Sequence, residues 1–197
     1  IKPTKGYVIK LGSKIAGLGG DEQFVKTEAS GKIYRGIYGN NVIFSTELEG
    51  GILTMGKGYS KIVDRFQLGG RSFRGFKYSG IGPRELSGGA YTIPLGGEKY
   101  AIARFAASFP LGLPRELGLF GSIFAEAGTL WDLKTDPNVS GLSNKIALTD
   151  RNLRTSIGFA MNWETPIGPL QFNWSRPQKY LDADSLEYFS LNLATRF

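Results

Sequence analysis

The chain has 197 residues, enough to bury one hydrophobic core, and a mean hydropathy of −0.15, which fits neither a helical membrane protein nor a charged, disordered chain. It contains no cysteine and no histidine, which excludes disulfides, thiolate metal sites and the usual Ser-His or Cys-His nucleophiles. Carboxylates alone would leave only glycosidase-like or hard-cation chemistry open, so an enzyme is the weaker class, and we predict a single domain that is not an enzyme and uses no cofactor or metal. The net charge of +7 is scattered, without a block of consecutive basic residues, so we expect no nucleic-acid partner.

The first residues carry no recognisable targeting segment. Residues 1–14 lack an apolar signal core followed by a small-residue cleavage site. We expect either that such a peptide was removed or that the chain is a fragment. No apolar run approaches the roughly 18 residues of a spanning helix, so insertion into a membrane would have to use strands.

Three segments of alternating residues come first along the chain. In residues 7–18 the apolar side chains occupy odd positions, while two lysines occupy even positions. The same period of two runs through residues 24–35 and 42–52, and GNN at residues 39–41 separates the last two segments as a tight turn. This period is typical of a strand with one apolar and one polar face, so we predict three strands here.

Five more predicted strands follow a glycine-rich stretch, at residues 100–109, 117–128, 153–163, 170–175 and 187–197. In all eight strands the charges within the strand cores lie on the face opposite the apolar side chains: Lys10, Lys14, Lys26, Glu28, Lys32, Glu47, Glu49, Arg104, Glu126, Arg154 and Arg196. A soluble sandwich or a lipocalin-type barrel, whose apolar face points inward, would give the same alternation. The pattern alone therefore leaves both classes open.

Strand length and connections favour a membrane barrel. The predicted strands exceed the average of about five or six residues and match the roughly nine to eleven needed to cross a bilayer obliquely. Aromatic residues lie near strand ends, as in interfacial girdles: Tyr7, Tyr100, Phe109, Trp131, Trp163, Trp174, Phe189 and Phe197. Connections are short at residues 39–41, 110–116 and 165–169 but long at residues 56–97 and 132–150, as in outer-membrane proteins with periplasmic short turns. We predict an all-β fold, a transmembrane antiparallel β-barrel of eight strands.

The longest connection, residues 56–97, holds the segment DRFQLGGRSFRGFKYSGIGPRE at residues 64–85. Loops of this length are usually either functional or disordered. Here aromatic residues alternate with glycines that permit unusual backbone angles, and GIGPRE is typical of a fixed turn. We therefore expect a structured, functional loop.

This segment resembles the signature of the sixth extracellular loop in the BamA family of outer-membrane β-barrel assembly factors, which combines LGG, an RGF-type tetrapeptide and IGPR. Residues 109–132, 153–177 and 189–197 agree with the family in the same order, so that nearly the whole chain from residue 55 onward is covered. The matching loop positions are Gly69, Gly70, Arg74, Gly75, Phe76, Ile81, Gly82, Pro83 and Arg84.

The resemblance implies a partner for the loop arginine. In that family the loop folds into the barrel lumen and its arginine contacts an acidic residue on an inner strand face, which here gives Arg74 and Glu126. The family generally has aspartate at the second position, so Glu126 is one methylene longer, and a bidentate contact stays feasible. Arg74 either helps to move clients, the unfolded proteins that such an assembly factor folds, or only anchors the loop. We favour anchoring, since a buried, paired arginine fixes a loop whether or not it also moves clients. Carboxylate catalysis at Glu126 is disfavoured because it needs a second carboxylate.

The last predicted strand alternates Phe189, Leu191, Leu193, Thr195 and Phe197 and ends on an aromatic residue. The resemblance implies two roles for it. Outer-membrane barrels carry such a strand as a recognition signal for their own assembly. In the BamA family it also forms one side of a lateral gate, where the backbone of residues 188–197 would offer unpaired edge groups to an incoming strand.

The resemblance also implies what the chain lacks. The family's barrel has sixteen strands after a series of POTRA domains, and the signature loop joins its eleventh and twelfth strands. Three predicted strands precede the loop here and five follow it, so we expect a C-terminal fragment in which residues 1–197 form one barrel domain without POTRA domains. An eight-stranded barrel has room inside only for side chains. We therefore predict that the loop lies outside, on the extracellular side, or moves freely, and that Arg74 does not reach Glu126.

The function implied by the resemblance is that of an insertase, which folds β-barrel proteins into the outer membrane of a Gram-negative bacterium by thinning the bilayer and templating strands. Its partners would be the lipid bilayer, unfolded outer-membrane proteins and, in the full-length family, accessory assembly lipoproteins. Two alternatives stay open: an inactive, structural eight-stranded barrel, and a related translocation or secretion barrel of the same superfamily.

Overall fold

The computed structural model describes residues 4–17, 23–39, 41–134, 146–166 and 168–193. Within them the fold is all-β, as predicted, and no helix is long and apolar enough to cross a membrane. The elements are β1 (Lys5–Ala16), β2 (Gln23–Ile37), β3 (Val42–Lys57), β4 (Arg84–Ser87), β5 (Ala90–Pro94), β6 (Lys99–Pro110), the 3-10 helix η1 (Arg115–Leu117), β7 (Leu119–Trp131), β8 (Ile146–Ala147), β9 (Arg154–Thr165), β10 (Gly168–Lys179) and β11 (Phe189–Leu193).

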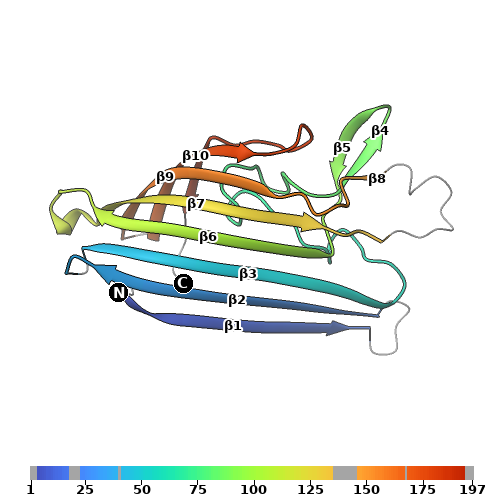
Figure 1. The fold of residues 1–197 in the computed structure, drawn as a ribbon, viewed down its shortest axis with the longest axis horizontal. Helices are drawn as coiled ribbons and strands as arrows, with labels where there is room; N and C mark the ends of the chain where they lie inside the picture. Colours follow the sequence, from blue (N-terminus) through green and yellow to red (C-terminus); the bar gives the residue numbers. More distant parts are fainter. Residues whose placement is uncertain (1–3, 18–22, 40, 135–145, 167, 194–197) are drawn as a thin grey trace.

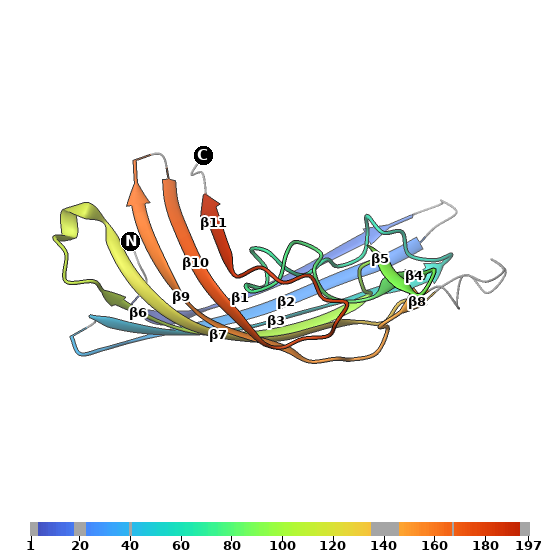
Figure 2. The ribbon, with the colours of Figure 1, turned by 90° about the horizontal axis from the view of Figure 1, so that it is seen from above.

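The long strands form one antiparallel, eight-stranded sheet in the order β1-β2-β3-β6-β7-β9-β10-β11. The sheet is curved, and β9, β10 and β11 rise out of the flatter part formed by β1, β2 and β3 (Figures 1 and 2). Within the described residues β1 and β11 are the two edges and do not pair with each other. The predicted closed barrel of eight strands is therefore not seen in this part of the chain.

The short strands β4, β5 and β8 form a second sheet in the order β5-β4-β8. It lies at the end of the main sheet where the long connections are, next to the end of β7 (Figure 1). The sequence analysis did not predict it, because runs of two to five residues are too short to show a period.

The two faces of the main sheet differ as the alternation predicted. Strand pairing places Lys32, Glu47, Arg104, Glu126 and Ser156 side by side in one row across β2, β3, β6, β7 and β9, on the concave, inner face. Large apolar side chains of the opposite, outer face are 44–77% exposed: Tyr7, Ile9, Leu11, Ile15, Ile33, Phe44, Leu48, Ile52, Phe105, Ile123, Ile157, Trp174, Phe189, Leu191 and Leu193. The polar face is therefore the enclosed one.

The connection between β3 and β6 packs onto the inner face. Its segment from residue 58 to residue 83 lies in the trough of the curved sheet (Figure 2). The hydrophobic core lies between this loop and the sheet, and it comprises Phe24, Leu53, Phe66, Leu68, Phe73, Phe76, Ile81, Tyr100, Ile102 and Leu130. The prediction that the loop lies outside or moves freely is wrong. It assumed a closed eight-stranded barrel, whereas the open, curved sheet leaves its concave side free for the loop.

Candidate functional site

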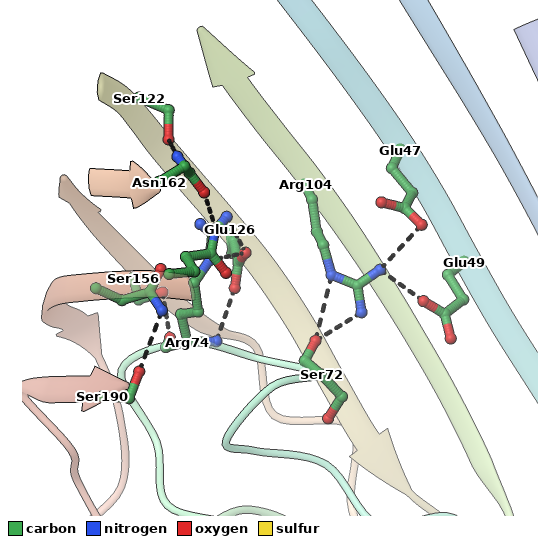
Figure 3. Close-up of polar contacts among 12 residues, drawn as sticks. Glu47, Glu49, Ser72, Arg74, Arg104, Ser122, Glu126, Ser156, Asn162 and Ser190 are labelled. Atoms are coloured by element: carbon green, nitrogen blue, oxygen red, sulfur yellow. Dashed lines mark hydrogen bonds and ion pairs between the residues drawn. The ribbon is translucent and has the colours of Figure 1, made fainter. Parts of the chain in front are cut away.

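Arg74 and Glu126 are joined at the centre of the inner face (Figure 3). The Nε and Nη2 atoms of Arg74 lie 2.7 Å and 2.5 Å from Oε1 of Glu126, and the backbone N–H of Arg74 donates to Oε2 at 2.8 Å. The prediction that Arg74 does not reach Glu126 is therefore wrong, for the reason given for the loop as a whole. Both carboxylate oxygens of Glu126 accept charge-assisted hydrogen bonds from Arg74. A glutamate at this position therefore reaches the loop arginine.

Two further contacts hold Arg74 in place. Its guanidinium carbon lies 3.5 Å from the centroid of the Phe124 ring, within the range of a cation–π contact. The hydroxyl of Ser156 on β9 donates to the carbonyl oxygen of Arg74 at 2.6 Å. The side chain of Arg74 is 13% exposed and that of Glu126 only 2%. We call the group Arg74, Phe124, Glu126 and Ser156 the loop clamp.

Gly75 and Phe76 complete the contact of the loop with the sheet. Gly75 has φ +94°, and a Cβ atom there would lie 2.9 Å from Cβ of Ser156. Only glycine suits this backbone angle and this close approach. Phe76 is fully buried, and its ring centroid lies 4.9 Å from that of Phe73. In the RGF tripeptide, Arg74 thus supplies a charged anchor, Gly75 allows the backbone to approach the sheet closely, and Phe76 supplies a core side chain.

The LGG motif forms the turn that precedes the clamp. Gly69 has φ +126°, and a Cβ atom there would overlap the carbonyl oxygen of Lys77. The backbone N–H of Gly70 donates to the carbonyl oxygen of Phe76 at 2.6 Å, and the hydroxyl of Ser72 donates to that of Gly69 at 2.9 Å. The turn therefore folds back on the residues that follow it.

The IGPR motif connects the loop to the end of β7. Ile81 and Pro83 are buried, and at Gly82, with φ +102°, a Cβ atom would lie 2.5 Å from Cδ2 of Leu130. The buried Arg84 donates from Nη2 to the carbonyl oxygen of Gly80 at 2.9 Å. Burial lowers the pKa of the Arg84 guanidinium, but arginine stays protonated in proteins. Arg84 also donates to the hydroxyl of Ser185 at 3.3 Å, so this motif arginine holds the loop to itself and to the β10–β11 connection rather than to the main sheet.

Arg104 is a second connection between loop and sheet, and the sequence analysis recognised it only as an inner-face charge. From β6 it donates through Nη2 to the carbonyl oxygen of Ser72 at 2.6 Å (Figure 3). Its Nη1 atom lies 2.5 Å from Glu49 and 3.6 Å from Glu47, both on β3. The alternating pattern places three carboxylates near Arg104 on the inner face, which indicated an ion-pair network. It did not indicate that Arg104 also binds the loop.

Another arginine holds the connection between β10 and β11. Arg154 donates from Nε and Nη2 to the two carboxylate oxygens of Asp184, at 3.0 Å each, and both side chains are 0% exposed. This connection pairs with the long loop through backbone bonds of Lys77 to Ser185 and of Glu187 to Gly75, each 2.9 Å. The two connections therefore form one layer on the inner face. The sequence analysis gave Asp184 no role, since no motif or period includes it.

The base of the long loop is fixed by a polar group. Ser60 donates to Oε1 of the buried Glu98 at 2.6 Å and accepts from Nε of Arg65 at 2.8 Å. Arg65 also donates to the carbonyl oxygens of Ser60 and Leu95. The loop is therefore closed by hydrogen bonds where it leaves and re-enters the sheet.

The predicted gate strand is described only in part. Phe189, Leu191 and Leu193 of β11 are exposed on the outer face, while Thr195 and Phe197 lie outside the described residues. Among the described residues β11 pairs with β10 alone. Its other edge carries backbone groups available for a further strand.

Within this part of the chain no group of three or more His, Cys, Asp or Glu side chains could hold a metal ion.

Comparisons with known proteins agree with this geometry. A family model described as "Omp85 superfamily domain" matches residues 1–197. The chain is similar to the outer membrane protein assembly factor BamA of Neorickettsia risticii, with 30% identity over 173 residues that cover 86% of the chain and 21% of that protein. The same assembly factor of Neisseria meningitidis is 28% identical over 221 residues, covering 99% of the chain and 26% of that protein.

Two further similarities extend the comparison. The sorting and assembly machinery component 50 homolog of Mus musculus is 39% identical over 127 residues, which cover 63% of the chain and 26% of that protein. The crystal structure of BamA from Haemophilus ducreyi lacking POTRA domains 1-3 superposes with a TM-score of 0.83 at 23% identity, over 96% of the chain and 38% of that structure. The chain thus spans about a fifth to a quarter of these curated relatives. With the family match over its whole length, the chain belongs to the Omp85 superfamily.

Proposed function

We propose that this chain is the membrane-embedded C-terminal part of an assembly insertase, which folds β-barrel proteins into an outer membrane without nucleotide or cofactor. The relatives that the chain matches are named as assembly factors or as an assembly machinery component. Because the chain spans only part of them, their activity is extended to it here as a proposal. It is not an enzyme in this account, and nucleic acid is not a partner.

The exposed outer face supports embedding in a bilayer. Ile123, Trp174 and Phe189 belong to a row of apolar side chains that crosses β3, β6, β7, β9, β10 and β11 in register. Burying such a surface in lipid is favourable by about 25 cal/mol per Å² of apolar area. A spanning sheet must also close, since lipid offers no partners for an unpaired backbone edge. We therefore propose that the sheet is one wall of a transmembrane β-barrel, with pairing partners for β1 and β11 from outside the described residues.

The observation that carries the proposal is the edge of β11 that has no partner within the described residues, beside a loop layer that is clamped to the inner face. An unfolded client protein can add a strand to such an edge by backbone pairing. The loop clamp and the Arg154–Asp184 pair hold the curvature of the sheet behind this edge. In this mechanism Arg74 is a positioning residue: it fixes the loop layer and does not itself contact the client.

The partners proposed are the lipid bilayer, unfolded outer-membrane proteins and, for the whole protein, accessory assembly lipoproteins. The relatives come from bacteria and from animals, so the outer membrane of a Gram-negative bacterium stays a prediction. The two alternatives, an inactive structural barrel and a translocation or secretion barrel, make different predictions about activity in lipid.

The test is client folding into liposomes that contain the refolded protein, compared with empty liposomes and with liposomes that hold an unrelated eight-stranded barrel. Acceleration above both controls is the expected result. Folding rates equal to those with the unrelated barrel would favour the structural alternative, and ion conductance without client folding would favour a translocation barrel.

A further inference from the structure

Several cations of the outer face have no counter-charge among the described residues, and one of them, Arg176, lies beside an apolar hollow. By strand register, the outer-face charges of the main sheet in the described residues are all cations: Lys5, Arg35, Lys99, Arg176 and Lys179. Lys99 pairs with Asp132 at 2.8 Å. Arg176 is exposed, and its guanidinium has no partner among the described residues. A free arginine on a lipid-facing surface is costly unless its charge finds water or an anion.

An open, shallow hollow of about 680 Å³ lies beside Arg176, and we call it the groove. Ile123, Ile157 and Trp174 line it with apolar surface, and Tyr188 lies at its rim, next to the start of β11. None of the lining residues is acidic. The site therefore combines the Arg176 cation with an open, mostly apolar hollow on the same face.

Arg176 lies close to the end of its own strand, β10. It lies three residues before Lys179, the last residue of β10 at the end of the long connections. Trp174 is the previous outer-face residue, and its ring lies 5.5 Å from that of Phe189 and 5.9 Å from that of Phe159. An aromatic cluster followed by a cation matches the order of acyl chain, interface and phosphate in a lipid monolayer.

We propose that Arg176 and this groove bind a phosphate-bearing membrane lipid, with the phosphate on the guanidinium and one acyl chain against Ile157 and Trp174. Guanidinium matches phosphate through paired N–H donors. The inference rests on the membrane embedding proposed above. The bound lipid would lie beside the β10–β11 pair, outside the sheet and opposite the loop layer.

The experiment measures quenching of Trp174 by brominated lipids. The protein carries Trp131→Phe and Trp163→Phe, so that Trp174 is the only tryptophan of residues 1–197. It is reconstituted in phosphatidylcholine vesicles doped either with brominated phosphatidic acid or with brominated diacylglycerol, which has the same chains without phosphate. We expect phosphatidic acid to be preferred about fivefold, the ratio that corresponds to about 1 kcal/mol for one arginine at a lipid surface.

Variants and competitors separate the outcomes. Arg176→Gln should abolish the preference, whereas Arg35→Gln, which removes another exposed outer-face arginine, should leave it unchanged. A preference that survives in Arg176→Gln would overturn the proposal. Inorganic phosphate should not displace the lipid, and displacement would show a site for free phosphate instead. If brominated phosphatidylcholine itself fails to quench Trp174, the membrane embedding is wrong, and not only the lipid site.

Discussion

The two arginine–carboxylate pairs of the inner face hold neighbouring connections in different surroundings. Arg154 and Asp184 are both fully buried and share two hydrogen bonds of 3.0 Å. Arg74 is 13% exposed, and its contacts with Glu126 border an open polar hollow on the inner face. Separating either pair leaves a buried carboxylate, Asp184 or Glu126, without its counter-charge. The Arg74 guanidinium, unlike that of Arg154, nevertheless borders the hollow and can reach water. We infer that the Arg154–Asp184 pair is the more costly of the two to break.

The largest effect is expected from Asp184→Ala. It leaves the Arg154 guanidinium buried without its carboxylate, which should lower the free energy of unfolding by about 3–5 kcal/mol. Urea unfolding in detergent micelles measures this change. A loss below about 1 kcal/mol would mean that water reaches Arg154 and that the two pairs do not differ in kind.

Gly75→Ala should rank second. The positive φ of Gly75 and the 2.9 Å approach to Ser156 both oppose a side chain, and together they should cost about 2–3 kcal/mol. Gly31→Ala is the matched control, because nothing lies within 4 Å of the added atom and its backbone angle is ordinary. Equal effects of the two substitutions would show that the loop does not pass this close to β9.

Arg104→Gln should have an intermediate effect. It removes the donors to the carbonyl oxygen of Ser72 and to Glu49, which predicts a loss of about 1–2 kcal/mol. Hydrogen exchange should show faster opening of the loop around Ser72, with the β9–β10 pairing unchanged. Unchanged exchange in the loop would mean that the Arg74 contacts alone hold it.

Lys99→Ala should have the smallest effect. Its pair with Asp132 is 39% and 27% exposed, and exposed ion pairs contribute about 0–1 kcal/mol. The midpoint of urea unfolding should therefore move little, and less at high salt. A shift as large as that of Arg104→Gln would contradict the ranking by burial.

The sequence predicted the long strands, their two faces and the loop motif well, because each rests on a local signal. The alternation in residues 24–35 and 42–52 corresponds to β2 and β3, and the RGF glycine lies where only glycine fits. The strand predicted at residues 170–175 was too short: β10 runs over Gly168–Lys179, and Pro169 and Pro177 within it hid the pattern.

The position of the loop was not predictable from these signals. The expectation that Arg74 stays away from Glu126 followed from assuming that β1 closes on β11. Closure of the sheet into a barrel depends on the curvature of the sheet and on pairing partners outside each strand. The alternation within one strand encodes neither of them. Asp184 was missed for a similar reason, since its only signal is spatial proximity to Arg154, 30 residues earlier in the chain.

The most direct test of the central claim is a double-mutant cycle on Arg74 and Glu126, read out by the rate of client folding in liposomes. The account predicts that Arg74→Gln and Glu126→Gln each slow client folding, and that the double variant is no slower than either, because both remove the same clamp. If the two effects add, or if neither variant slows folding while Asp184→Ala destabilises the protein as expected, the loop clamp does not support assembly.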